Sequence, residues 1–301
     1  MTQRFTRAAL VALGLALAGA LGACSMVGGR DSGAGRAPGA GGSKDFTRCP
    51  LAERMTPAVD SEYGQAFMGR FSKLVVYPAE AVDAGQGGVV SLCARVTRDG
   101  RVHDGRIATG SGYPALDGAA LLALGRMMAA EEGTAMPKDF AHGQDSVWLL
   151  FPVNFQPPGG NHVRYLSALP DRPCKDTGSK EGDVAGQEVT LKEWGDYPGM
   201  FSDAVKQELV YPPEALQAGQ SGYTLLCVAL DRDSHLIGAS ISRSSGYPLL
   251  DGASLLALGM VQLKAHMPPV PDRVRQAHDR AIFTQEIEWN PKAPTPKLSK
   301  D

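Results

Sequence analysis

The segment SGYPALDGAALLALG, residues 111–125, recurs as SGYPLLDGASLLALG at residues 245–259, with two of the fifteen positions changed. The same offset of 134 residues aligns further pairs outside this segment: Tyr77 with Tyr211, Cys93 with Cys227, and Phe155 with Trp289. No gap is needed to keep this offset across the aligned region. The chain therefore contains one domain twice in tandem.

The recurring segment predicts a junction from a strand to a helix. Pro114 and Pro248 suit the first helical turn, because proline presets φ and lacks an N–H that would be unbonded there. Asp117 and Asp251 fall in the same turn, the helix N-terminal cap region, where a carboxylate meets free N–H groups and the positive end of the helix dipole. A catalytic role for these carboxylates is the alternative, but no second acid or histidine recurs beside either.

The flanking pattern is the same in each repeat. A short helix after Tyr-Pro ends at Gly85 or Gly219, an alternating strand and a turn follow, and a second strand leads into the recurring segment. An apolar alternating strand closes each repeat, ending at Phe155 and Trp289. We therefore predict an α+β fold of two tandem domains, each with two helices packed on a three-stranded antiparallel sheet.

The first residues read as an export signal. Arg4 and Arg7 precede an apolar run over residues 8–21, which is too short to span a bilayer as a helix. Leu21-Gly22-Ala23-Cys24 resembles the lipobox of bacterial lipoproteins, which implies lipidation of Cys24 and anchoring by acyl chains; an ordinary cleaved signal is the alternative. In such lipoproteins a serine after the cysteine, here Ser25, implies the outer membrane.

These features divide the chain into segments. The signal covers residues 1–24, a Gly-rich flexible tether 25–44, the two domains 45–160 and 161–292, and a polar tail 293–301. The formal net charge is −2, and no block of Lys or Arg stands out. A nucleic-acid partner is therefore not expected, because binding a phosphate backbone requires a basic surface.

Four cysteines besides Cys24 lie in the exported part, where an oxidising environment favours disulfides. Four cysteines permit three pairings. Each repeat has one cysteine on its first strand and one in the segment before it, so symmetry favours Cys49 with Cys93 and Cys174 with Cys227. A metal or redox role is the alternative, but no Cys-x-x-Cys or His-rich spacing occurs. The histidines occupy no equivalent positions, and no catalytic motif is present, so we expect no enzyme, metal or cofactor.

These motifs together resemble the TonB C-terminal domain. The resemblance rests on Tyr-Pro-x-x-Ala followed by Gly, the alternating strand, Ser-Gly-x-x-x-Leu-Asp-x-Ala-x-Leu and the closing strand, over residues 75–155 and 209–289. It implies binding of an extended segment of an outer-membrane receptor at a sheet edge, and some such domains associate with peptidoglycan. Energy transducers of this family carry an inner-membrane helix and a Pro-rich spacer. A lipobox and a short tether stand here instead, so we expect no energy transduction by this chain alone.

The closing strands differ at one aligned position, which is Pro152 in the first repeat and Glu286 in the second. A proline removes a ladder N–H and indicates a blunted edge. We therefore predict that the second repeat binds the peptide; the alternative is that its edge is covered by the first domain or by the tail. The predicted edge residues are Ala281, Ile282, Phe283, Thr284, Gln285, Glu286, Ile287 and Glu288.

The sequence thus predicts a lipid-anchored, non-catalytic protein-binding module on the periplasmic side of the outer membrane, accessory to TonB-dependent transport. A structural tether or scaffold that binds peptidoglycan or another envelope protein is the alternative.

Overall fold

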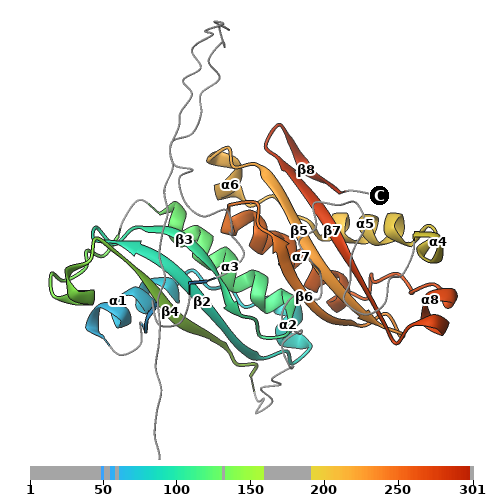
Figure 1. The fold of residues 1–301 in the computed structure, drawn as a ribbon, viewed down its shortest axis with the longest axis horizontal. Coiled ribbons are helices and arrows are strands. Elements are labelled where there is room, and N and C mark those ends of the chain that lie inside the picture. Colours follow the sequence, from blue (N-terminus) through green and yellow to red (C-terminus); the bar gives the residue numbers. More distant parts are fainter. Residues whose placement is uncertain (1–48, 51–54, 58–60, 131–132, 159–190, 299–301) are drawn as a thin grey trace, which may run out of the picture. The chain divides into compact units, whose positions relative to one another are not determined.

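The computed structural model describes residues 49–50, 55–57, 61–130, 133–158 and 191–298, and the two repeats belong to one compact unit (Figure 1). Cys24, Cys174 and the predicted signal and tether segments lie outside the described residues. Within these ranges no helix has both the length and the apolar character needed to cross a membrane.

Each repeat forms one four-stranded sheet with helices. The elements of the first repeat are β1 (Met55–Pro57), α1 (Glu62–Phe71), α2 (Ala79–Asp83), β2 (Gly88–Thr97), β3 (Val102–Thr109), α3 (Pro114–Ala129), the 3₁₀ turn η2 (Phe140–Gly143) and β4 (Ser146–Phe155). Those of the second are α4 (Leu191–Trp194), α5 (Tyr197–Glu208), α6 (Pro213–Gln217), β5 (Gly222–Asp231), β6 (Leu236–Arg243), α7 (Pro248–Leu263), α8 (Asp272–Ala277), β7 (Arg280–Asn290) and β8 (Ala293–Leu298). The sheet orders are β1-β4-β2-β3 and β6-β5-β7-β8. The first sheet is mixed because β1 is parallel to β4, and the second is antiparallel.

The predicted α+β core is confirmed in both repeats. The order helix, strand, strand, helix, strand is α2-β2-β3-α3-β4 in the first and α6-β5-β6-α7-β7 in the second, and the three strands of each core are antiparallel. The prediction of two helices and three strands per repeat is incomplete, however. A longer helix, α1 or α5, precedes each core, and a fourth strand, β1 or β8, extends each sheet.

Two local features hold the short helices α2 and α6 against their strands. Each is followed by a glycine in the left-handed region, Gly85 with φ 63° and Gly219 with φ 62°, as predicted for a helix C-terminus. The Tyr77 hydroxyl donates to the backbone oxygen of Gln86, and the Tyr211 hydroxyl donates to that of the equivalent residue, Gln220. The Tyr-Pro motif therefore closes a loop around each short helix.

The added helices α1 and α5 bring aromatic rings onto the sheets. Phe67 and Phe71 of α1 both meet Phe151 of β4 edge-on, with ring centroids 5.1 Å apart in each pair. In the second repeat Phe201 of α5 meets Phe283 of β7 at 4.8 Å. Edge-on aromatic pairs contribute roughly 0.5–1.5 kcal/mol beyond their buried area, so α1 and α5 help to fix β4 and β7 in place.

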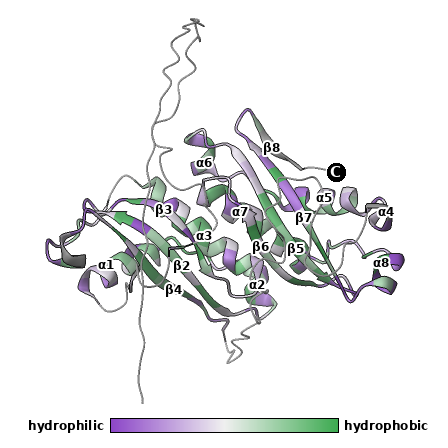
Figure 2. Cartoon of the chain, viewed as in Figure 1, coloured by the Kyte–Doolittle hydropathy of each residue, from purple (hydrophilic) through white to green (hydrophobic). Residues whose placement is uncertain are grey.

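The strands of the second sheet differ in polarity. Figure 2 shows hydrophilic residues along β7 and β8, in contrast to the largely apolar β5.

The two recurring helices, α3 and α7, pack against each other. A Cβ atom built on Gly252 would lie 2.7 Å from the backbone nitrogen of Leu122, and one on Gly118 would collide with that of Leu256. Gly125 lies equally close to Leu249, as Gly259 does to Ala115. Because each contact has an equivalent with the repeats exchanged, the interface is isologous, like that of a two-fold dimer.

This crossing explains why α3 is buried on two faces. Leu116, Ala120, Ala123, Leu124 and Met127 are buried in the core of the first repeat. Leu122 is also buried, but in the core cluster of the second repeat. The helix therefore lies between its own sheet and its counterpart, and the two repeats form an internal dimer.

Candidate peptide-binding edge

The outer side of β7 is the candidate site in the second repeat. On its inner side β7 pairs with β5 from Arg280 to Trp289. On its outer side β8 pairs with it only at Ile287, Glu288 and Asn290. Along residues 280–286, no strand in the described part of the chain pairs with that outer side.

The predicted open edge, Ala281 to Glu288, is therefore wrong at its last two residues. Ile287 and Glu288 pair with Leu298 and Lys297 of β8, which is formed by residues assigned to the polar tail. The tail turns back after β7, and the side-chain oxygen of Asn290 accepts the Lys292 N–H at 3.0 Å in this turn. Tail coverage was the alternative considered from the sequence, and within the described residues it is seen at this end of the strand.

Residues 280–286 of β7 have side-chain contacts on both faces of the sheet. On the helix side Phe283 packs on Phe201, and the Ser202 hydroxyl donates to the Gln285 side-chain oxygen at 3.1 Å in a buried contact. On the opposite face Arg243 of β6 forms an ion pair with Glu286, across Leu225 of β5. The backbone of this edge is therefore ordered before any partner arrives, which lowers the entropy cost of adding a strand.

The equivalent edge of the first repeat is covered differently. The short strand β1 runs parallel to β4 and pairs with Trp148, Leu149 and Leu150. Pro152 lies just beyond this cover and has no N–H to offer a partner. The outer side of β4 is therefore less suited to an added strand than that of β7.

A disulfide anchors the segment that leads to β1. Cys49 is bonded to Cys93 of β2, with Cα atoms 6.0 Å apart, as the symmetry of the repeats predicts. Cys227 of β5 is also disulfide-bonded. Its predicted partner, Cys174, lies outside the described residues, so that pairing stays a prediction.

Asp117 and Asp251 fasten the junction between strand and helix. Asp117 Oδ1 accepts the Ser111 N–H at 2.7 Å and the Ser111 hydroxyl at 2.8 Å. Asp251 Oδ1 accepts the Ser245 N–H and the Thr224 hydroxyl, each at 2.9 Å. Both carboxylates thus bond to residues outside their own helices. The expectation that they bond to free N–H groups of the helix is corrected in this respect.

Both of these carboxyl groups are buried, and burial changes their acidity. Desolvation raises the pKa of Asp117 to about 6, against the hydrogen bonds from Ser111. It also raises the pKa of Asp251. Each carboxyl group accepts hydrogen bonds from neighbouring serine or threonine residues, and no acid in the described ranges is bonded to it, so we infer that both residues stabilise the fold.

One cluster of metal-ligand types was not singled out from the sequence. Asp231, Asp233 and His235 lie together in the turn between β5 and β6. Asp231 Oδ1 already accepts the N–H groups of Asp233 and His235, at 2.9 and 2.8 Å, and its other oxygen lies 3.1 Å from His235 Nδ1. These hydrogen bonds stabilise the turn, which explains why the three side chains lie together.

Comparison with known proteins gives one match. The family model described as Gram-negative bacterial TonB protein C-terminal matches residues 73–157 and 207–291, together more than half of the chain. Searches of curated proteins and of solved structures gave no match. Each matched range begins just before the Tyr-Pro motif and ends just after β4 or β7.

Proposed function

Because the chain belongs to the TonB C-terminal family, we propose that it is a non-catalytic lipoprotein of the outer membrane, facing the periplasm, which binds an extended receptor segment on β7. TonB C-terminal domains are interaction modules of the cell envelope, which sets the class of function. The lipobox at Cys24 supports the anchor. The proposed role is that of an accessory to TonB-dependent transport.

The observation that carries this proposal is the aligned pair Pro152 and Glu286: residues 280–286 contain no proline, so each keeps the backbone N–H that pairing with an added strand uses. A strand edge with free N–H and C=O groups pairs readily with another extended chain. This stretch of seven residues has the length of a typical strand, so one extended segment would pair along all of it. The equivalent edge of the first repeat carries β1 and Pro152 instead, which supports placing the site in the second repeat.

The alignment of the repeats indicates which N–H group faces a partner. Pro152 pairs with Ser91 inside a β2–β4 register that runs unbroken from Gly88 to Thr97. Because proline has no N–H, this position does not need one for the inner ladder. Glu286 occupies the same position against Leu225. Its N–H is therefore expected to point to the open side.

The test is a proline at this position. Glu286→Pro copies a residue that the first repeat already accommodates, so the fold is expected to survive, while binding to the edge is lost. Glu286→Gln removes the ion pair with Arg243 but keeps the N–H, and it should bind normally. The probes are synthetic peptides that cover the N-terminal segments of outer-membrane receptors from the same cells.

Unchanged affinity of Glu286→Pro for these peptides would contradict the site. If no peptide binds and the chain instead co-sediments with purified peptidoglycan sacculi, a role as a structural tether to peptidoglycan replaces the proposed role in transport.

A further inference from the structure

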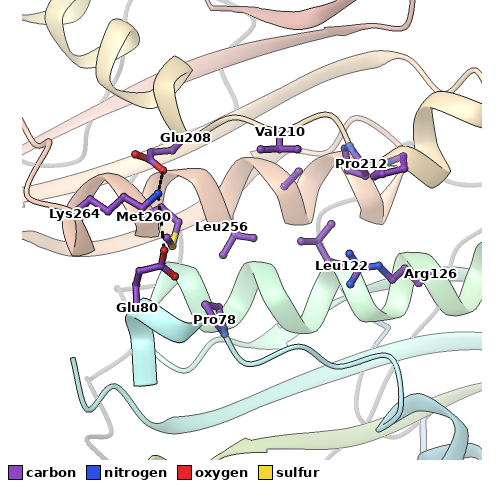
Figure 3. Close-up of a pocket in the computed structure, with 12 residues that line it drawn as sticks. Pro78, Glu80, Leu122, Arg126, Glu208, Val210, Pro212, Leu256, Met260 and Lys264 are labelled. Carbon is purple, nitrogen blue, oxygen red and sulfur yellow. Dashed lines mark hydrogen bonds and ion pairs between the residues drawn. The ribbon is translucent and has the colours of Figure 1, made fainter. Parts of the chain in front are cut away.

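A pocket of about 310 Å³ lies where the two repeats meet (Figure 3). Leu122 of α3 and Leu256 of α7 line its middle, and Pro78 and Pro212 line it from the loops before α2 and α6. Leu122 and Leu256 are equivalent residues, as are the two prolines. The pocket therefore exists only because both repeats are present, and it is separate from the β7 edge.

The middle of the pocket is apolar and small. Met260 and Ala253 of α7 add to the leucine and proline side chains. A volume of this size is at the lower end of ligand sites, so it suits a bulky side chain better than a nucleotide or a large cofactor. Val210 forms part of the wall, and its side chain is 70% exposed. An exposed valine beside an apolar pocket favours a partner that covers both.

Of the two acidic residues that line the pocket, Glu80 has the weaker ion pair. Lys264 Nζ lies 2.7 Å from a Glu208 oxygen, and Arg126 Nε lies 3.0 Å from Glu214 Oε1. Each cation thus has a close carboxylate. Glu80 has only a longer contact, 3.9 Å to Lys264, and its side chain is 41% exposed. Glu214, the ion-pair partner of Arg126, does not itself line the pocket.

Glu80 and Glu214 are equivalent residues of the two repeats. As Figure 3 shows, Glu80 lies with Lys264 and Glu208 at one end, Arg126 lies at the other, and Leu122 and Leu256 lie between them. A group that fits must therefore be apolar in its middle and able to donate hydrogen bonds or bring positive charge at an end.

We propose that this pocket anchors a segment of a partner protein that presents a bulky apolar side chain next to a basic residue. The apolar side chain lies between Leu122 and Leu256, and the basic group meets Glu80. A polypeptide is favoured over a small molecule because Val210 projects at the wall and is covered only by a partner that extends past the pocket. The pocket does not depend on strand addition, so the two sites can fail separately.

The test uses the full chain with labelled methyl groups and three capped dipeptides. Acetyl-Phe-Lys-amide should shift the methyl signals of Leu122, Leu256 and Met260 in a saturable manner. Acetyl-Phe-Glu-amide should bind about tenfold more weakly because its carboxylate meets Glu80, and acetyl-Ala-Lys-amide should give no saturable shift. Val210→Ser should weaken binding of the first peptide about fivefold through lost apolar contact.

The equivalent position in the first repeat supplies the control. Val76 is 61% exposed and does not line the pocket, so Val76→Ser should leave the affinity unchanged. Glu286→Pro should also leave it unchanged. The proposal is overturned if the three methyl signals do not move, if both Phe peptides bind equally, or if Val76→Ser weakens binding as much as Val210→Ser. Tighter binding of uncharged octanol than of any peptide would also overturn it, in favour of a small apolar ligand.

Discussion

Gly118 of α3 and Gly252 of α7 lie against each other's helices at the same position of their repeats, and the backbones meet there without any side chain between them. Each residue also lies in the segment that recurs in the sequence. The repeated helix thus has two partners, its own sheet and its counterpart. Conversion of two domains into one compact unit depends on this crossing.

A side chain at this crossing should therefore separate or strain the repeats. Gly252→Leu places its Cβ 2.7 Å from the Leu122 backbone nitrogen, and we expect a loss of at least about 2 kcal/mol in the free energy of unfolding. Chemical denaturation measures it. The control is Gly69→Ala in α1, where nothing lies within 4 Å of the new Cβ. It should raise stability by about 0.5–1 kcal/mol. A neutral effect of Gly252→Leu would show that the helices do not meet closely.

The buried Asp117 should make stability depend on pH. Its pKa is about 6 in the folded protein, above the ordinary aspartate value of 3.8, because the carboxyl group is buried. The folded state therefore holds a proton that the unfolded state releases between these values, so this group's contribution falls as pH rises from about 4 to 6. This change in the contribution of Asp117 to the free energy of unfolding is on the order of 3 kcal/mol.

Asp117→Asn should remove this component. Unfolding free energies of the two proteins at pH 4 and pH 7 measure it, with Asp203→Asn at an exposed position as the control. If the difference between wild type and Asp117→Asn is the same at both pH values, the carboxyl group does not titrate as described.

Removal of the Cys49–Cys93 disulfide should expose the edge of β4. The double change Cys49→Ala and Cys93→Ala releases a link across 44 residues of sequence, which should cost about 4 kcal/mol in the chain-entropy model. Amide hydrogen exchange should then quicken at Trp148, Leu149 and Leu150, where β1 pairs. Exchange at Ile287 and Glu288 should stay the same. Unchanged exchange at all five residues would mean that β1 holds its place without the disulfide.

Much of the core could be predicted because its signals are local or repeated. The proline at the helix start, the glycine after each short helix and the alternating strands each indicate one element. The Cys49–Cys93 bond followed from the symmetry of the repeats. The site on β7 was inferred from one aligned pair, Pro152 and Glu286, and it stays a proposal.

The rest depended on long-range contacts or on weak patterns. Tyr63, Phe67 and Phe71 recur every four residues after Ser61, which caps α1, so this helix did carry a signal. The strand β8 carried no such signal in the sequence, because Pro294 and Pro296 argue against a strand unless it lies at an edge. The glycines of the recurring segment indicate close packing, but only the fold shows that the neighbour is the other repeat.

The most direct measurement places a photo-crosslinking residue at Thr284, in the open stretch of β7, in living cells. A matched variant carries it at Leu150, the equivalent residue of β4, where β1 covers the edge. We predict that Thr284 captures an N-terminal segment of an outer-membrane receptor and that Leu150 does not. Capture of no receptor segment at Thr284, or equal capture at both positions, would contradict strand addition at β7.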